Sequence, residues 1–438
     1  MCGTSAGRIA RGVGLALGGA ALVLVGAAGP AAAHTAGGPV PAPPWLLGYL
    51  GAFLVLVSAL ALRAGWIRVP ALAGTGDDPG PEARPRPVAM RPGQLVGLVL
   101  LGLVVAAAIV GPDAYASNVA PVAVYVSWLL VPFLSLVVGD VVRALNPYVP
   151  LVRLVEGGRS RLSGEGPIWI PAALLASVAW YFLAYHRPGS PRALAVYLVS
   201  YALVVVALGI RYGSRWVLAG EGLGALSAAV STVAPLRRSP APPGTAAVIV
   251  VWVGSVLFDG LTSTTLWDDV AADVVGWERT LRSTLGLAWA IGLVGAAYLI
   301  ALWAARIRLG DTEPAEGVDL RLALGASLVP LGLAWFIGHD LSLLIFEGQN
   351  LIALLSDPIG RGWDLLGTVT DTLDYGLAQE AWVSWVQIAA LGIGHVAAVL
   401  VAHRVARSLL PTRPAMTVTW AMAGLAAVSV VAGALMLL

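Results

Sequence analysis

The sequence predicts an all-α protein: a polytopic integral membrane helix bundle of about ten transmembrane helices behind a signal peptide. The first observation is composition, because hydrophobic residues make up 58% of the 438 positions, charged residues only 11%, and the mean hydropathy is +0.84. A soluble protein would carry about 25% charged residues. The second and third observations are the recurrence of apolar segments of spanning length and the alternation of arginine between their connectors.

The N-terminal segment, residues 1–33, has the three parts of a secretory signal. Arg8 and Arg11 form a basic start, residues 13–25 an apolar stretch, and the alanines at 31–33 a cleavage site of the A-x-A type. An uncleaved first span is the alternative interpretation. Cleavage would leave residues 34–438 as a single membrane domain.

Ten apolar segments follow, each of about the length that crosses a bilayer as a helix. Small residues recur in them at helix-packing spacing, as in Gly93-x3-Gly97 and Gly292-x3-Ala296, and predict close contact between helices. The segments are 45–65, 92–111, 121–142, 167–185, 193–212, 245–264, 284–305, 322–346, 381–402 and 415–437.

Arginine distinguishes two alternating sets of connectors between these segments. The chain has no lysine, and beyond the signal segment 19 arginines fall in one set and 5 in the other. Positive charge marks cytoplasmic loops, so the arginine-rich set is predicted to be cytoplasmic. The protein is then a multi-pass protein of the inner (plasma) membrane, and both ends of the mature chain are extracytoplasmic.

Three connectors have distinct compositions. Residues 67–91 are rich in proline, glycine and charge, which predicts a cytoplasmic linker. Residues 222–235 are too short and polar to span, and we expect them to lie along the inner interface. Residues 347–380 form a long outer loop with several apolar residues, which predicts a cap that folds back on the bundle.

The chemistry-bearing residues of the spans gather at one predicted depth. Ionisable groups inside a membrane span are expensive and usually face protein or a wet cavity. Asp259, His339 and Asp340 each lie about 5 to 6 residues below the outer end of their predicted spans, and Gln387 enters from a third span at the same level. We therefore expect an outward-facing polar pocket in which Asp259, His339 and Asp340 are catalytic.

Further residues are candidates for the wall of this pocket. Glu347 follows Asp340 by seven residues and shares its face of a helix, and Asp357 lies in the outer loop. His395 lies past the midplane, and a lone histidine at that depth is more typical of a hydrogen-bonded packing residue. His395→Ala is accordingly expected to reduce stability, whereas His339→Ala is expected to abolish activity.

A carboxylate–imidazole pair supports several chemistries. It can relay protons, act as a general acid and base, or bind a divalent metal; a buried network that fixes helix packing is the structural alternative. The single cysteine, Cys2, lies in the signal segment, which excludes thiol chemistry and disulfides from the mature chain. The absence of lysine excludes a P-loop.

Short motifs spread over more than half of the chain give a resemblance. They are Asn146-Pro147, Phe258-Asp259-Gly260, His339 with Ser342-Leu343-Leu344, Phe346-x-Gly348-Gln349, Ser356-Asp357-Pro358, Asp364-Leu365-x-Gly367-Thr368, Asp374-Tyr375-Gly376, Val386-Gln387 and Gly394-His395-Val396-Ala397. With a signal peptide ending before a histidine, the chain resembles actinobacterial polytopic membrane proteins labelled fenitrothion hydrolase. The resemblance implies hydrolysis of an organophosphate triester.

Three functions therefore remain open at the level of the sequence. One is a membrane phosphotriester hydrolase, another a proton- or ion-coupled transporter, and the third a non-catalytic membrane scaffold. The expected partners are the lipid bilayer and a small-molecule substrate from the outer side, and no nucleic acid. The sequence names no cofactor beyond the option of a divalent metal, and it leaves the oligomeric state open.

The alternation of arginine makes the topology testable. Reporter fusions in 67–91, 144–166, 213–244, 306–321 and 404–414 should all report a cytoplasmic location, because these connectors hold the arginine-rich set. Fusions in the arginine-poor connectors serve as controls and should report export. A single arginine-rich connector that reads as exported would require a different number of spans.

Overall fold

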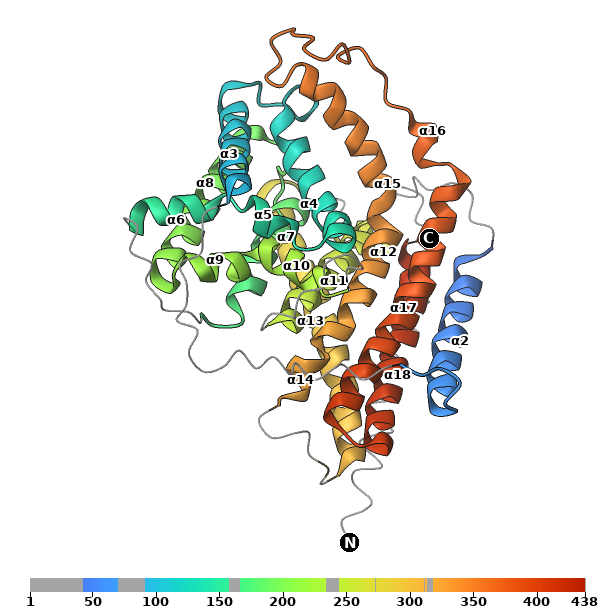
Figure 1. Ribbon diagram of the computed structural model, residues 1–438. Helices are drawn as coiled ribbons and strands as arrows, with labels where there is room; N and C mark the ends of the chain where they lie inside the picture. Colours follow the sequence, from blue (N-terminus) through green and yellow to red (C-terminus); the bar gives the residue numbers. More distant parts are fainter. Residues whose placement is uncertain are drawn as a thin grey trace.

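The computed structural model describes residues 42–69, 91–156, 166–233, 244–271, 273–310, 312 and 318–437, and within these ranges it is an all-α bundle without strands (Figure 1). The signal segment and most of the 67–91 linker lie outside the described residues. The α-helices are α2 Pro44–Arg63, α3 Pro92–Val110, α4 Val119–Val138, α5 Val141–Leu145, α6 Tyr148–Glu156, α7 Ile170–Leu183, α8 Pro191–Tyr212, α9 Ser214–Gly220, α10 Gly222–Ser231, α11 Thr245–Thr262, α12 Thr265–Ala271, α13 Gly276–Leu309, α14 Leu320–Ala323, α15 Leu328–Ser356, α16 Tyr375–Ala378, α17 Ala381–Leu409 and α18 Thr412–Leu437.

Each of the ten predicted spans coincides with a helix, and nine helices of the described ranges are long and apolar enough to cross a membrane. The all-α membrane bundle is thus confirmed. The exception in length is α7, whose 14 residues extend about 21 Å against a hydrocarbon core of about 30 Å. The segment 167–185 is therefore helical but shorter than a full span.

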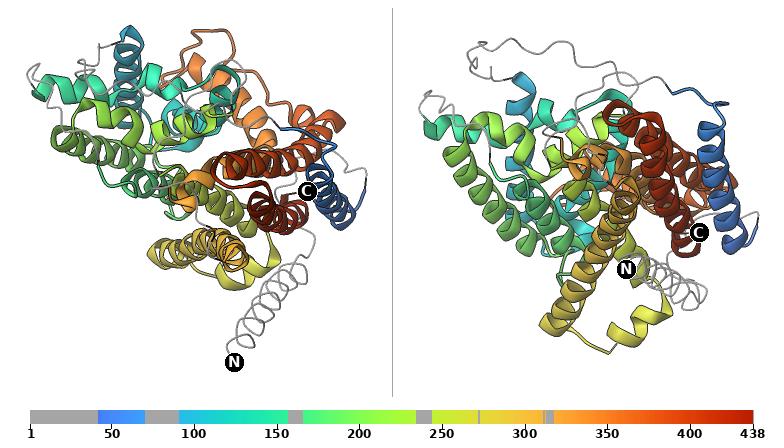
Figure 2. Two further views of the ribbon diagram at one scale, coloured as in Figure 1. Left: turned by 60° about the horizontal axis from the view of Figure 1, so that its bottom comes forward. Right: turned by 90° about the horizontal axis from the view of Figure 1, so that it is seen from below.

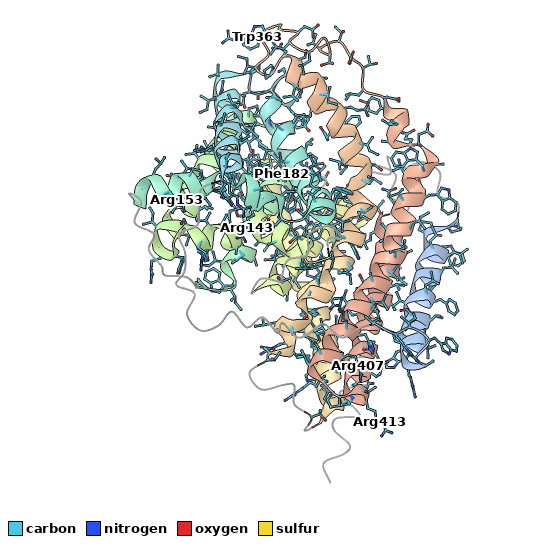
Figure 3. The ribbon with its side chains drawn as sticks, viewed as in Figure 1. Arg143, Arg153, Phe182, Trp363, Arg407 and Arg413 are labelled. Carbon is cyan, nitrogen blue, oxygen red and sulfur yellow. The ribbon has the colours of Figure 1, made fainter. Side chains whose placement is uncertain are left out.

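Helix α11 lies at the centre of the bundle, because 78% of the residues in its apolar stretch are buried. Helices α7, α13 and α15 pack against it. The long helices α15, α17 and α18 lie side by side, with α2 on the outside against α17 and α18 (Figures 1 and 2). Trp363 lies at the opposite end of the molecule from Arg407 and Arg413 (Figure 3), so the loop 347–380 and the connector 404–414 are far apart.

The described part of the segment 222–235 is not on the surface of the bundle, where a helix along the inner interface would lie. Its helix, α10, is buried along its length among α4, α7 and α11. Small residues on every face allow this, since a Cβ added at Gly222 would lie 2.7 Å from the backbone nitrogen of Leu175. The buried Glu221 carboxylate accepts hydrogen bonds from the first amides of α10 and from the Tyr201 hydroxyl at 2.5 Å, which satisfies the start of the helix.

One of the two predicted small-residue motifs makes a close helix contact. At Gly97 of α3, an added Cβ would lie 1.7 Å from the carbonyl oxygen of Leu145, and at Gly93 it would lie 2.6 Å from that of Ala144. Helix α3 therefore rests directly on the backbone of α5. Gly292 has no neighbour within 4 Å of such an atom, so the second motif forms no comparable contact.

Gly97→Ala should destabilise the protein, because the new methyl group forces α3 away from α5. Overpacking of this kind costs about 1–3 kcal/mol of unfolding free energy. Gly102→Ala on the same helix is the matched control, since nothing lies within 4 Å of its added Cβ. Thermal unfolding in detergent, followed by circular dichroism, measures both variants; equal melting temperatures would contradict the packing of α3 on α5.

Candidate functional site

Helix α11 brings Asp259 to the site in its last helical turn. The Thr262 hydroxyl donates to the carbonyl oxygen of Asp259 at 2.7 Å, and the helix is capped at Ser263. Ser255, one turn earlier, donates to the carbonyl of Val251 in the same way. These two hydroxyls are thus used within α11, whereas the carboxylate of Asp259 reaches across to α15.

Helix α15 supplies the other two groups and is longer than predicted. The sequence placed its outer end near residue 346, at the start of the 347–380 loop, but the helix continues to Ser356. The Asn350 side chain donates to the Glu347 carboxylate at 3.0 Å on the helix surface. The helix ends where Pro358 disfavours helical geometry at Asp357, which has φ −135° and ψ 72°.

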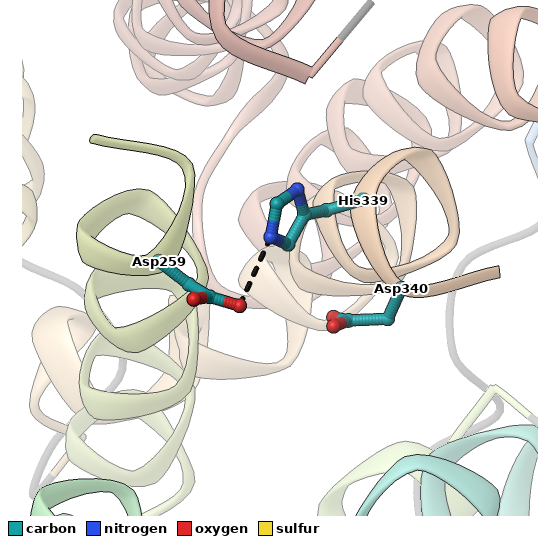
Figure 4. Close-up of side chains that lie close together, drawn as sticks. All are labelled: Asp259, His339 and Asp340. Carbon is teal, nitrogen blue, oxygen red and sulfur yellow. Dashed lines mark hydrogen bonds and ion pairs between the residues drawn. The ribbon is translucent and has the colours of Figure 1, made fainter. Parts of the chain in front are cut away.

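The predicted convergence of Asp259, His339 and Asp340 is present in the structure. His339 Nε2 lies 3.0 Å from Asp259 Oδ2, and the Asp340 carboxylate points toward this pair (Figure 4). One ligand-type atom from each residue lies within 4.8 Å of those of the other two. Two helices far apart in sequence therefore hold an imidazole and two carboxylates in contact range.

The cluster is mostly buried, and its three side chains differ in whether they form hydrogen bonds. The side chains of His339 and Asp259 are 10% and 26% exposed, so the surface reaches the site beside Asp259. Asp340 is only 4% exposed, and its carboxylate forms no hydrogen bond with any residue of the described ranges. A buried carboxylate without a partner is costly, and this makes Asp340 the unusual member of the cluster.

Two tyrosines that were not predicted from the sequence lie along α15 between this cluster and Glu347. Tyr125 of α4 is close enough to interact electrostatically with Asp259, Asp340 and Glu347, and Tyr115, just before α4, lies beside Glu347. Glu347 stands seven residues from Asp340 on the same helix, about 10 Å further out. Polar groups therefore continue from the cluster toward the outer end of α15 but are not part of it. In the sequence, the feature that could have indicated them is the pair Tyr115 and Tyr125, ten residues apart.

Gln387, another predicted pocket residue, does not face the cluster. Its buried amide donates to the carbonyl oxygen of Gly338 at 3.0 Å and to the Ser342 hydroxyl at 3.4 Å. Gln387 therefore ties α17 to α15. The prediction of its depth was accurate, but its direction depends on how α17 is rotated.

His395 is likewise absent from the cluster and lies in a closed network. Its Nδ1 is 2.6 Å from the carbonyl oxygen of Leu391, so Nδ1 carries a proton and donates. Its Nε2 then accepts from the Ser429 hydroxyl at 3.0 Å, and that hydroxyl accepts from Trp335 Nε1 at 2.8 Å. Every polar atom of the His395 ring is used in packing α15, α17 and α18 together.

Asp357 shapes the outer loop and lies away from the cluster. Its two carboxylate oxygens accept from the backbone amides of Arg361 and Gly362 at 2.8 and 2.7 Å. Such bonds are typical of an aspartate that forms a turn. The structure therefore gives Asp357 a conformational role in the loop.

The cap predicted for 347–380 forms only in part. Leu354 is buried, and Leu351 and Ile359 pack with it in an apolar cluster. Trp363, Leu365 and Leu366 remain 46%, 63% and 59% exposed, so this part of the loop does not fold back on the bundle as expected. Instead, the Gln349 side chain exchanges hydrogen bonds with the backbone of Asp374 at 2.9 and 3.2 Å. A glutamine side chain carries both a donor and an acceptor, so it can bind the N–H and the C=O group of one residue at the same time.

Ser356 forms the hydrogen bonds that hold the middle of the loop in place. It is fully buried, donates to Asp364 Oδ1 at 2.6 Å, and accepts from the amide of Leu366 at 3.0 Å. The donation from Ser356 and the nearby amide of Val369 hold the pKa of the Asp364 carboxyl below its ordinary value. The loop is therefore most stable when Asp364 is charged.

The cluster can act chemically because an ionised Asp259 carboxylate only accepts hydrogen bonds and so favours the His339 tautomer with its proton on Nε2. A proton on Nε2 donates to the Asp259 carboxylate, which orients the ring and leaves Nδ1 as the free nitrogen. The paired carboxylate stabilises the imidazolium that forms when Nδ1 accepts a proton. Together with Asp340, the arrangement supports proton transfer or cation binding between the last turn of α11 and the middle of α15.

Comparisons with protein families, with curated proteins and with solved structures return no significant match to this chain.

The bonds around Ser356 predict how the loop responds to pH and to mutation. Because the pKa of Asp364 is lowered in the folded loop, its stabilising effect is complete at neutral pH and is lost as the pH falls below 3.8 toward the lowered value. Ser356→Ala should loosen the loop at neutral pH as well. Hydrogen exchange of residues 357–374 measures both effects, with Ser408→Ala as a control on a distant helix; an unchanged exchange rate in Ser356→Ala would contradict this role.

Proposed function

We propose that this chain is a membrane hydrolase that acts from the outer side on small neutral phosphotriesters, with Asp259, His339 and Asp340 as its catalytic residues. The observation that carries the proposal is the 3.0 Å contact between His339 Nε2 and Asp259 Oδ2, next to a third acidic group. The resemblance to the proteins labelled fenitrothion hydrolase supplies the substrate class. An apolar triester also suits a site inside a bilayer, into which such a compound partitions.

The proposed reaction needs only water as co-substrate. A water molecule beside His339 loses a proton to Nδ1 as its oxygen forms a bond to phosphorus. The bond between phosphorus and the leaving alkoxide or phenolate breaks, and the proton on Nδ1 then passes to that leaving group or to solvent. General base catalysis by a positioned imidazole typically contributes about 10²–10⁴-fold to the rate.

A transporter is the weaker candidate because the deeper histidine of the described spans is not connected to the cluster. A proton path across the membrane requires exchangeable groups on both sides of the site. His395 is the one histidine deep in the described spans, and both of its nitrogens are engaged in the closed network with Leu391 and Ser429. The polar residues near Asp340 extend outward instead, toward Tyr125 and Glu347.

Phosphotriester hydrolysis by the purified protein in nanodiscs tests the proposal. Diethyl 4-nitrophenyl phosphate is a suitable probe, because release of nitrophenolate is read directly from its absorbance. His339→Ala and His339→Gln should lower kcat by about 100-fold or more, since both remove the base. Asp259→Asn should lower it by a comparable factor, because the asparagine amide can donate to Nε2 and so places the ring proton on Nδ1, which removes the base.

His395→Ala is the matched control, since it also removes a buried histidine from the bundle. It should lower the melting temperature by breaking the network with Ser429, while kcat of the folded protein remains near that of the parent. If the parent protein does not hydrolyse the probe, or His339→Ala turns it over at the parent rate, the proposed function is wrong.

A further inference from the structure

We propose that Asp259, His339 and Asp340 form a binding site for one divalent transition-metal cation. This inference gives the proposed hydrolase a cofactor, but binding itself is independent of the reaction. It starts from Asp340, whose side chain is buried, forms no hydrogen bond with the described residues, and points at the other two groups (Figure 4). An unpartnered carboxylate directed into a cluster with an imidazole indicates that a cation completes the arrangement.

The distances in the cluster suit a metal ion. Two ligands that each lie about 2.1 Å from a cation, at a bond angle near 90°, are about 3.0 Å apart. His339 Nε2 and Asp259 Oδ2 are separated by that distance. All three donor atoms lie within 4.8 Å of one another, whereas two ligands of one cation can be at most about 4.2 Å apart. Asp340 would therefore move by a few tenths of an ångström, which an unbonded carboxylate can do.

The charges in the cluster also favour a divalent cation. Asp259 and Asp340 approach each other in a largely buried region, where two carboxylates repel one another more strongly than in water. His339 can compensate one negative charge when it is protonated. A divalent cation compensates both carboxylates and leaves the imidazole neutral, the form in which histidine binds metals.

The donor set indicates which cations bind. One imidazole nitrogen with two carboxylates suits zinc, manganese, iron(II) or cobalt(II), whereas calcium and magnesium prefer sites made of oxygen alone. Three protein ligands leave at least one position for water, as in catalytic zinc sites. A bound cation would lower the pKa of that water, so it would activate the nucleophile without the base that His339 provides in the metal-free cluster.

Metal binding to the purified, tag-free and chelator-treated protein tests the inference. Cobalt(II) is the probe, because its d–d absorption reports a nitrogen–oxygen ligand set, and elemental analysis gives the stoichiometry. We expect one cobalt per chain and a melting temperature that rises with cobalt concentration. Asp340→Asn and His339→Gln should each weaken binding by about tenfold or more, since each removes a ligand.

Asp340→Asn is informative because it should fold. It has nearly the same shape as the parent side chain and removes a buried charge, so its metal-free melting temperature should equal or exceed that of the parent. Glu347→Gln is the matched control, a carboxylate on the same face of α15 about 10 Å away, and it should bind cobalt as the parent does. Equal cobalt affinity in the parent and Asp340→Asn would overturn the inference.

The outcomes separate this inference from the proposed function. Cobalt bound through Asp340 without hydrolysis of the phosphotriester supports the metal site and contradicts the hydrolase. Hydrolysis at the full rate after removal of all metal, with no cobalt binding that depends on Asp340, overturns the metal site and leaves the hydrolase with His339 as its base.

Discussion

The structure depends on the rule that a polar group inside a bilayer must find its partner within the protein, because hydrocarbon offers none. Three buried side chains follow this rule and join helices by doing so. Glu221 satisfies the start of α10 and binds Tyr201, Gln387 ties α17 to α15, and His395 closes a network with α18. Asn146 Nδ2, Trp252 Nε1 and Arg404 Nε are buried without a partner among the described residues, and the Asp340 carboxylate forms no hydrogen bond there. Of these groups, Asp340 alone lies beside an imidazole and a second carboxylate, and we give it a functional explanation.

The sequence predicts the helices well and their ends less well. Apolar segments located all ten predicted helices, because a run of apolar residues of that length has few other stable states. The outer end of α15 was missed by ten residues, since polar residues such as Asn350 are compatible with a helix that continues beyond the apolar run. The burial of α10 was also missed, because a short helix of glycine, alanine and serine has no apolar stripe that reveals its neighbours.

The site could be predicted as far as depth decides it. Asp259 and the pair on α15 were expected at one level, and they meet there. Depth alone cannot give direction, because the rotation of a helix about its axis is set by all of its packing contacts. For this reason the sequence did not predict that Gln387 binds the backbone of α15. It also did not predict that Tyr125 of α4 lies near the cluster.

The geometry of neighbouring residues on a helix explains why this cluster differs from a structural ion pair. His339 and Asp340 are consecutive, so their side chains leave α15 about 100° apart and diverge. An ion pair that served only to join α15 to α11 would need only one of these two residues, because His339 alone already contacts Asp259. When a second, divergent group also turns toward that contact, all three point to a small region outside α15. A water molecule or a cation in that region is the simplest object that all three can bind, and this argues for a site rather than for packing alone.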